Sequence, residues 1–143
     1  MVGETSDGQM RMLRISHLGD LEPGAMGLLE PPLTDGTGSP RECVETTALG
    51  EGYDVVLMPG FAFDRAGGRL GRGGGFYDRF VARLTASAAE QGRPPPVLLA
   101  LCYDEQVVEA VPAHAHDHPV DFIATPTELI TCAAEGRSPS SKF

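Results

Sequence analysis

The stretch RLGRGGGFYD, residues 69–78, constrains the fold of this chain more than any other feature, because it sets four glycines and two arginines before an amphipathic segment. Glycine weakens helix and strand interiors, so such a dense run predicts a loop whose backbone is approached closely. Apolar residues then recur every four positions from Phe76 to Ala88, which predicts a helix over 76–91 that ends at Gly92. The sequence thus predicts a glycine loop leading into a helix N-terminus, an arrangement that suits an anion.

The segments around this loop predict an α/β fold with a largely parallel sheet. Short apolar runs indicate buried strands, and residues 53–60 are expected to form a central one. The glycine loop follows that strand, at the end where sheets of this kind bind ligands. Further strands are expected at 10–15, 97–103 and 120–125, with a short helical turn after 103 and a possible last strand near 126–130. We expect residues 1–9 to be disordered, 10–130 to form one domain and 131–143 to form a polar tail.

The net charge indicates which kinds of partner this chain binds, and the cysteine content indicates the cellular compartment. The net charge of −9 disfavours general binding to nucleic acid, yet five of the eleven basic residues fall between Arg65 and Arg83. No apolar run is long enough to cross a bilayer, so no membrane association is expected. The three cysteines are widely spaced, which favours neither a disulfide framework nor a zinc site and indicates a reducing, cytoplasmic location. The C-terminal SKF resembles a peroxisomal signal but ends in Phe143, so peroxisomal and organellar locations stay open.

The glycine loop matches neither of two common phosphate-binding motifs. No Lys-Ser or Lys-Thr follows a glycine, which excludes a P-loop, and Phe76 stands where a dinucleotide fingerprint needs glycine. The same physics still applies, because consecutive glycines expose backbone N–H groups and the following helix adds its positive end. Arg69 and Arg72 are placed to hold phosphate oxygens.

Several side chains near the loop have two interpretations. Asp78, in the first helical turn, is either a favourable charge at the helix dipole or a magnesium ligand. Phe76 and Tyr77 are either helix core or, for one of the two, a pocket residue. Farther along, HAHDH suggests either a metal site or a plain loop, with Asp117 as a separate candidate ligand. No residue stands in a nucleophile motif, so covalent catalysis is not expected.

The segment VVLMPGFAFDRAGGRLGRGGGFYDRF resembles the signature of the 5-formyltetrahydrofolate cyclo-ligase family, and the resemblance extends over roughly residues 10 to 126. It implies a Rossmann-like three-layer α/β/α sandwich and a reaction that uses ATP and Mg²⁺ to convert 5-formyltetrahydrofolate into 5,10-methenyltetrahydrofolate. In that reaction the formyl oxygen attacks the γ-phosphate, and N10 of the folate then displaces phosphate as the ring closes. Such chemistry depends on positioning and charge neutralisation.

The resemblance also implies roles for individual residues. Asp78 and Asp117 would bind Mg²⁺, and Arg72 and Tyr77 would be catalytic; His114, His116 and His118 receive no role. The residues implied to contact ATP are Arg69, Leu70, Gly71, Arg72, Gly73, Gly74, Gly75, Phe76 and Tyr77. Those implied to contact the folate substrate are Arg72, Gly73, Gly74, Gly75 and Phe76.

The resemblance also implies an N-terminal segment before the region that resembles MRMLRI, and we expect this chain to lack it. That segment holds an initial helix with ATP-binding Lys and Arg, the first strands and folate-contacting residues. Two hypotheses follow: a cyclo-ligase, or a catalytically incomplete relative that binds nucleotide or folate or regulates another copy. Self-association or a partner that completes the fold is expected in either case.

Overall fold

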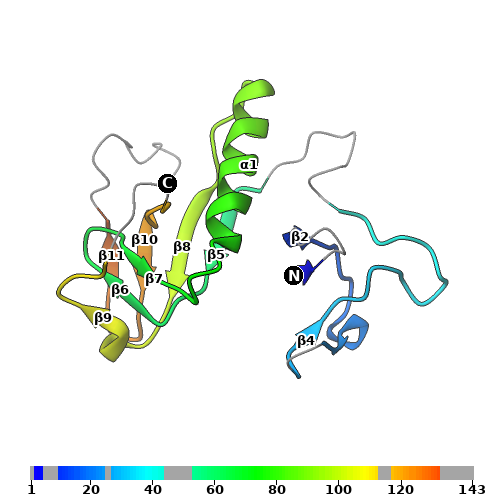
Figure 1. The fold of residues 1–143 in the computed structure, drawn as a ribbon, viewed down its shortest axis with the longest axis horizontal. Coiled ribbons are helices and arrows are strands. Elements are labelled where there is room, and N and C mark those ends of the chain that lie inside the picture. Colours follow the sequence, from blue (N-terminus) through cyan, green and yellow to red (C-terminus); the bar gives the residue numbers. More distant parts are fainter. Residues whose placement is uncertain (1, 5–9, 25–26, 44–52, 113–116, 133–143) are drawn as a thin grey trace. The chain divides into compact units, whose positions relative to one another are not determined.

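The computed structural model describes residues 2–4, 10–24, 27–43, 53–112 and 117–132. Two compact units divide the chain, Met1–Gly52 and Tyr53–Phe143 (Figure 1). The single domain expected over 10–130 stays a prediction. No helix of the described residues is both long and apolar enough to span a membrane, and none of the three cysteines, which all lie in the described ranges, is part of a disulfide.

The first unit is built from short antiparallel pairs. Val2–Glu4 form β1, within the segment expected to be disordered, because their backbone pairs with β2. Buried side chains of Met10, Leu13 and Cys43 form its small apolar core. Its elements are β1 (Val2–Glu4), β2 (Met10–Met12), the 3-10 helix η1 (Leu18–Asp20), β3 (Glu22–Pro23) and β4 (Leu29–Glu30).

The second unit holds the glycine loop and is built on a four-stranded sheet of order β11-β10-β8-β5. β5, β8 and β10 are parallel, and β11 returns antiparallel to β10. This mixed α/β architecture confirms the predicted fold class. The elements are β5 (Val55–Met58), β6 (Ala62–Asp64), β7 (Arg69–Leu70), α1 (Phe76–Glu90), β8 (Val97–Leu101), η2 (Asp104–Gln106), β9 (Val107–Val108), β10 (Phe122–Ala124) and β11 (Leu129–Thr131).

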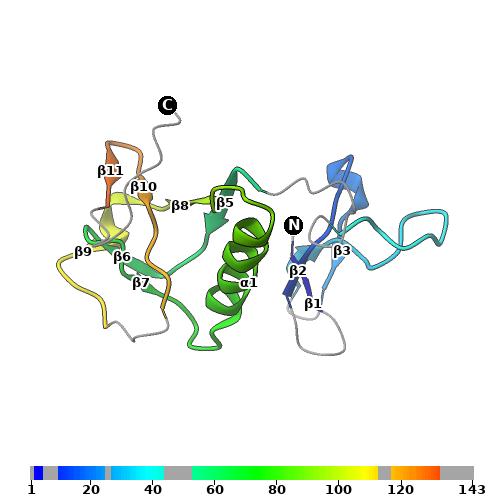
Figure 2. The same cartoon turned by 90° about the horizontal axis from the view of Figure 1, so that it is seen from above.

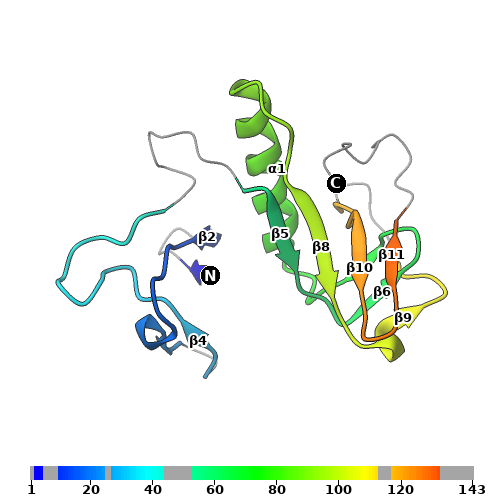
Figure 3. The ribbon, with the colours of Figure 1, turned by 180° about the vertical axis from the view of Figure 1, so that it is seen from behind.

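One face of this sheet packs against α1, which lies behind the strands in Figure 3 and beside them in the view from above (Figure 2). Strand alternation sends every second side chain to this face. Met58, Ala100 and Ile123 stand in one row across the three parallel strands and are almost completely buried. The helix contributes Phe80, Val81 and Ala88, also buried. The periodicity of residues 76–91 thus predicts the helix correctly.

The other side of the sheet, here called the second face, is apolar and more open. Leu57, Leu99 and Phe122 form a row in register across β5, β8 and β10. Its most exposed members are Val55 (42% exposed), Leu57 (55%), Leu101 (59%) and Leu129 (66%). Parallel strands normally have both faces covered. Among the described residues of the second unit one face carries α1, so the three-layer Rossmann-like sandwich stays a prediction.

Two expectations from the sequence are corrected here. β5 is expected in the sheet centre but forms its edge among the described strands, and its burial alternates because only one of its faces packs on the helix. The expected loop over 61–75 contains the antiparallel hairpin β6–β7, and β6 also pairs in parallel with β9. Its strands are too short to give a periodic signal, and the turn between them contains Gly67 and Gly68. The strand at 10–15 is β2, and the turn after 103 is η2.

Candidate functional site

The glycine loop reaches α1 through two residues in the left-handed backbone region. Gly73 has φ of +80° and Gly75, the N-cap of α1, has φ of +63°. Residues with a Cβ are strained there, and glycine is not. A Cβ on Gly74 would stand 2.6 Å from the ring of Phe76, so that position also favours glycine. The glycines thus determine the path by which the chain enters the helix.

The first turn of α1 begins without a side-chain cap from its N-cap residue. Gly75 supplies no side-chain cap, and the first helical hydrogen bond of the turn is Arg79 N–H to the Gly75 carbonyl. The free N–H groups of a helix start, together with the helix dipole, favour a negative group. Arg79 also donates from Nη1 to the Gly74 carbonyl at 3.0 Å, which fixes the orientation of the preceding peptide.

Asp78 lies in this first turn and forms an ion pair with Arg69 from β7. Nη2 of Arg69 is 3.0 Å from Oδ1 and 2.9 Å from Oδ2. The side chains are only 9% and 11% exposed. The backbone N–H of His118 donates to Oδ1 at 3.1 Å. The hairpin, the helix and the segment after residue 116 therefore meet at one carboxylate.

The surroundings of Asp78 keep it ionised. Burial alone would raise the pKa of this carboxyl, but the His118 N–H and the positive charge of Arg69 stabilise the charged form and hold the pKa below the ordinary 3.8. Asp78 is therefore a carboxylate at neutral pH.

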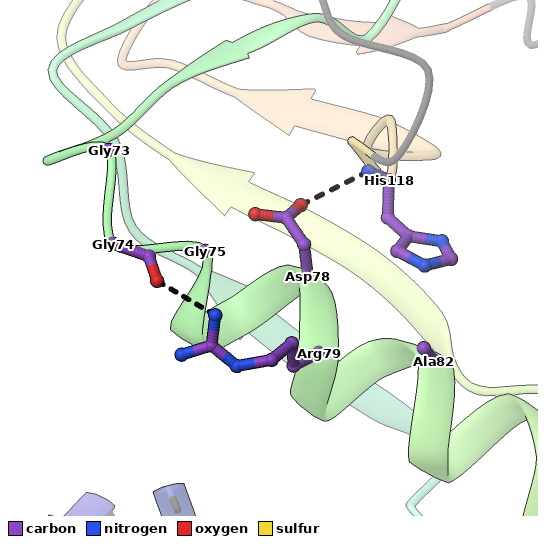
Figure 4. Close-up of a pocket in the computed structure, with 7 residues that line it drawn as sticks. All are labelled: Gly73, Gly74, Gly75, Asp78, Arg79, Ala82 and His118. Atoms are coloured by element: carbon purple, nitrogen blue, oxygen red, sulfur yellow. Dashed lines mark hydrogen bonds between the residues drawn. The ribbon is translucent and has the colours of Figure 1, made fainter. Parts of the chain in front are cut away.

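A pocket opens between the glycine loop, α1 and the segment that holds His118 (Figure 4). Its volume is about 360 Å³. Asp78 lies on its wall between the helix and the His118 backbone, and the imidazole of His118 points along α1 toward Ala82. The lining residues are Gly73, Gly74, Gly75, Asp78, Arg79, Ala82 and His118.

The structure brings some of the predicted residues together at this pocket and leaves others beside it. Gly73, Gly74, Gly75 and Asp78 line it. Arg69 is not among its lining residues and instead turns inward, where it also donates to the Pro59 carbonyl at 3.3 Å. Its Nε is buried and has no hydrogen-bond partner among the described residues.

The remaining predicted residues surround the loop. Tyr77 is half-buried, with the Arg69 guanidinium 5.8 Å from its ring centroid. Phe76 is 42% exposed and is covered by Arg79, 5.0 Å from its ring centroid, so it is not helix core. Leu70 and Arg72 are exposed, and a Cβ on Gly71 would stand 3.1 Å from Nη1 of Arg69. Asp117 is half-buried, next to the pocket residue His118. His114 and His116 lie outside the described residues.

Sequence reasoning missed Arg79, Ala82 and the backbone of His118. Helical spacing could have found the first two, since Ala82 follows Asp78 by one turn and Arg79 follows Gly75 by four residues. His118 contributes its main-chain N–H, a group that almost every residue type has, so the sequence does not indicate it.

The pocket suits a phosphate next to a hard cation. A cradle of glycine backbone and free helix-start amides binds phosphate oxygens. Among the residues that the structure describes, no three His, Cys, Asp or Glu side chains gather into a metal cluster. Mg²⁺ does not require one, because it commonly uses one or two carboxylates, substrate phosphates and water. An ionised Asp78 on the pocket wall fits that pattern.

Comparison with known proteins identifies a family. A model of the 5-formyltetrahydrofolate cyclo-ligase family matches residues 2–126. The chain is 40% identical over 129 residues to the mitochondrial 5-formyltetrahydrofolate cyclo-ligase of Arabidopsis thaliana, covering 89% of this chain and 46% of the relative. It is 37% identical over 108 residues to the 5-formyltetrahydrofolate cyclo-ligase of Mycolicibacterium smegmatis, covering 76% and 47%.

A solved structure is also similar. The NMR structure of Aquifex aeolicus 5,10-methenyltetrahydrofolate synthetase aligns with a TM-score of 0.61 and 29% identity, over 96% of this chain and 60% of that one. The chain spans about half the length of the curated relatives named above. The family match covers most of the chain and includes the whole glycine loop and α1. The chain therefore belongs to the 5-formyltetrahydrofolate cyclo-ligase family.

Proposed function

We propose that this protein takes part in the ATP- and Mg²⁺-dependent conversion of 5-formyltetrahydrofolate to 5,10-methenyltetrahydrofolate, in one-carbon folate metabolism. The observation that carries the proposal is the pocket in which left-handed glycines, the open start of α1 and the Asp78 carboxylate meet. Its parts match what phosphoryl transfer needs, which is positioning and neutralisation of charge. Membership of the family supplies the substrate class.

In this proposal the ATP phosphates lie on residues 69–77, with their oxygens facing the helix-start amides. Residues 72–76 also contact the formyl end of the folate, whose oxygen attacks the γ-phosphate before N10 closes the ring. Arg72 and Tyr77 are the proposed catalytic residues: Arg72 is exposed at the loop, and Tyr77 packs under Arg69. Arg72 balances phosphate charge, and Tyr77 holds Arg69 in place.

Asp78 and Asp117 are the proposed ligands of Mg²⁺, which when bound neutralises phosphate charge. The ion pair between Arg69 and Asp78 bears on this role. Arg69 occupies lone pairs on both oxygens of Asp78. We propose that phosphate draws the guanidinium away when MgATP enters, since charged N–H donors bind phosphate as well as carboxylate.

The apolar second face leads to a proposal about partners. We propose that a further polypeptide, or a second copy, covers this face and completes the fold. Leu57 and Leu101 are exposed there on parallel strands that normally carry a layer on each side. We expect no nucleic acid or membrane partner and a cytoplasmic location; the Arabidopsis relative is named as mitochondrial.

The activity is tested by following methenyltetrahydrofolate absorbance from 5-formyltetrahydrofolate, ATP and Mg²⁺. Turnover that needs both ATP and Mg²⁺ supports the enzyme, and no turnover by folded protein contradicts activity of the chain alone. A binding or regulatory module is the second candidate, favoured by the open second face. Calorimetric titration with MgATP separates the two, because a module binds nucleotide without turnover.

A further inference from the structure

Asp64 connects the β6–β7 hairpin to a distant part of the chain. Its side chain is buried, and the residue is only 8% exposed. Oδ1 accepts the N–H groups of Ala66 at 3.0 Å and Gly68 at 2.8 Å, which holds the hairpin turn. Oδ2 accepts the N–H of Val111 at 3.0 Å, a residue 47 positions later. Oδ1 therefore binds N–H groups inside the hairpin turn, and Oδ2 binds an N–H group outside it.

The hairpin holds the same distant segment at a second point. The N–H of Val120 donates to the Gly67 carbonyl at 2.9 Å. Gly67 has φ of +95°, and a Cβ there would stand 2.5 Å from the carbonyl oxygen of Val120, so the two backbones touch. The chain is thus attached to the turn at Val111 and again at Val120, and Asp117 and His118 lie between these attachments.

We propose that Asp64 is a positioning residue for the Asp78 site. The hydrogen bonds at Val111 and Val120 hold the two described stretches on either side of residues 113–116, and His118, in the second stretch, donates its N–H to Asp78, 3.1 Å away. Groups that orient a ligand from outside its contact shell commonly change metal affinity 10–100-fold when altered. The link to Mg²⁺ rests on the proposed function, but the anchoring of His118 does not, and it is tested without nucleotide.

The test is Asp64→Asn in the full chain, followed by amide hydrogen exchange in NMR spectra. An amide side chain keeps one oxygen for Ala66 and Gly68 but turns an NH₂ group toward the N–H of Val111. We expect exchange at Val111 and His118 to become about tenfold faster, the effect of losing a hydrogen bond to a charged group. The His118 amide proton should also shift upfield as it leaves the Asp78 carboxylate, while Gly68 stays protected.

Two controls make each outcome decisive. Asp35→Asn alters a half-buried turn aspartate that accepts N–H groups from Thr37 at 2.9 Å and Ser39 at 3.0 Å, and it should leave His118 unchanged. The Leu98 amide, 2.7 Å from Asp121 Oδ2, reports opening of the whole unit. Faster exchange at Leu98 equal to that at His118 would show a general structural role and overturn the proposal.

A second variant alters the other contact between the hairpin and this part of the chain, the one between Gly67 and Val120. Gly67→Ala forces a Cβ against the Val120 carbonyl and should speed His118 exchange in the same way. An unchanged His118 amide in folded Asp64→Asn overturns the proposal. If Asp64→Asn does not fold, an unchanged His118 amide in Gly67→Ala overturns it, because Gly67 lies in the turn that Asp64 holds. Absence of turnover with ATP contradicts only the proposed function.

Discussion

Arg69 and Asp78 bind each other through a single guanidinium nitrogen that lies 3.0 Å and 2.9 Å from the two carboxylate oxygens. The pair joins the short strand β7 to the first turn of α1, across the glycine loop. Both side chains are about nine-tenths buried. The pair is therefore part of the packing of the loop as well as of the pocket wall.

Breaking this pair from one side should destabilise the second unit. Asp78→Asn leaves a buried guanidinium without its counter-ion, and Arg69→Gln leaves a buried carboxylate, so each should cost about 3 kcal/mol in free energy of unfolding. The double variant Arg69→Gln/Asp78→Asn removes both charges and should cost less than the sum of the two. Urea unfolding of the four proteins measures this, and strictly additive losses would contradict a coupled pair.

Comparing the double variant with Arg69→Gln separates the metal role of Asp78 from its structural role, because both proteins lack the guanidinium proposed to contact phosphate. If Asp78 binds Mg²⁺, the double variant should be folded and yet lose the Mg²⁺-dependent turnover or nucleotide binding that Arg69→Gln retains. Arg65→Gln is a suitable control, since Arg65 pairs with Glu128 on an exposed surface where ion pairs contribute little. Unchanged Mg²⁺ dependence in the double variant would exclude the proposed ligand.

Acid should weaken the contribution of Asp78 to stability. The pKa of Asp78 in the folded protein is below the ordinary 3.8. The folded state therefore binds the proton less tightly than the unfolded chain does, and ionisation of Asp78 stabilises the fold. The stabilisation is present above pH 3.8 and is lost as the pH falls through the folded-state pKa. The difference in free energy of unfolding between the wild type and Asp78→Asn should therefore shrink below pH 3.8. A constant difference from neutral pH to acid would contradict this.

The left-handed glycine at the start of α1 should matter for anion binding more than for stability. Gly75→Ala strains a backbone with φ of +63° and should cost about 1–2 kcal/mol. Gly92 has the same φ of +63° and lies past the other end of α1, so Gly92→Ala is a control for the backbone strain. Only Gly75→Ala should weaken binding of inorganic triphosphate, measured by calorimetry. Equal weakening in both would indicate that the loop does not bind phosphate.

Tyr77 should ionise late in an alkaline titration. Burial raises the pKa of its phenol above 10.0, and the nearby Arg69 charge offsets only part of that rise. Because the folded protein keeps this proton while the unfolded chain loses it, stability should fall as the pH rises above 10.0. Tyr77→Phe should remove tyrosinate absorbance that appears only above pH 10.0. Tyr103→Phe, at a 71% exposed position, should leave that late absorbance in place.

The sequence predicts those parts of the fold in which local pattern and packing agree. The periodicity from Phe76 onward and the apolar runs of β8 and β10 predict their elements well, because each packs one regular face. The edge position of β5 depends on which strands pair with it, and no local signal carries that. The β6–β7 hairpin was missed because its residues have low strand propensity and are held by Asp64 and by pairing with β9.

In the candidate site, too, the features set by local residue type are predictable from the sequence, and those set by distant contacts are not. Composition predicted the glycine cradle, since left-handed backbone requires a specific residue type. It did not predict that Arg69 faces Asp78, because the hairpin alone decides where that strand points. Nor did it predict the His118 donor, which is a backbone group positioned by contacts far away in the chain.

Successive side chains of β5 point to opposite faces of the sheet, so its four residues contribute to two different surfaces. Met58 faces α1, the helix that carries Asp78, whereas Leu57 faces the opposite, apolar side. A substitution can therefore change what packs on Leu57 without changing the pocket. A substitution in the pocket can likewise leave the surroundings of Leu57 unchanged. A change on one of these two surfaces therefore leaves the side chains of the other in place.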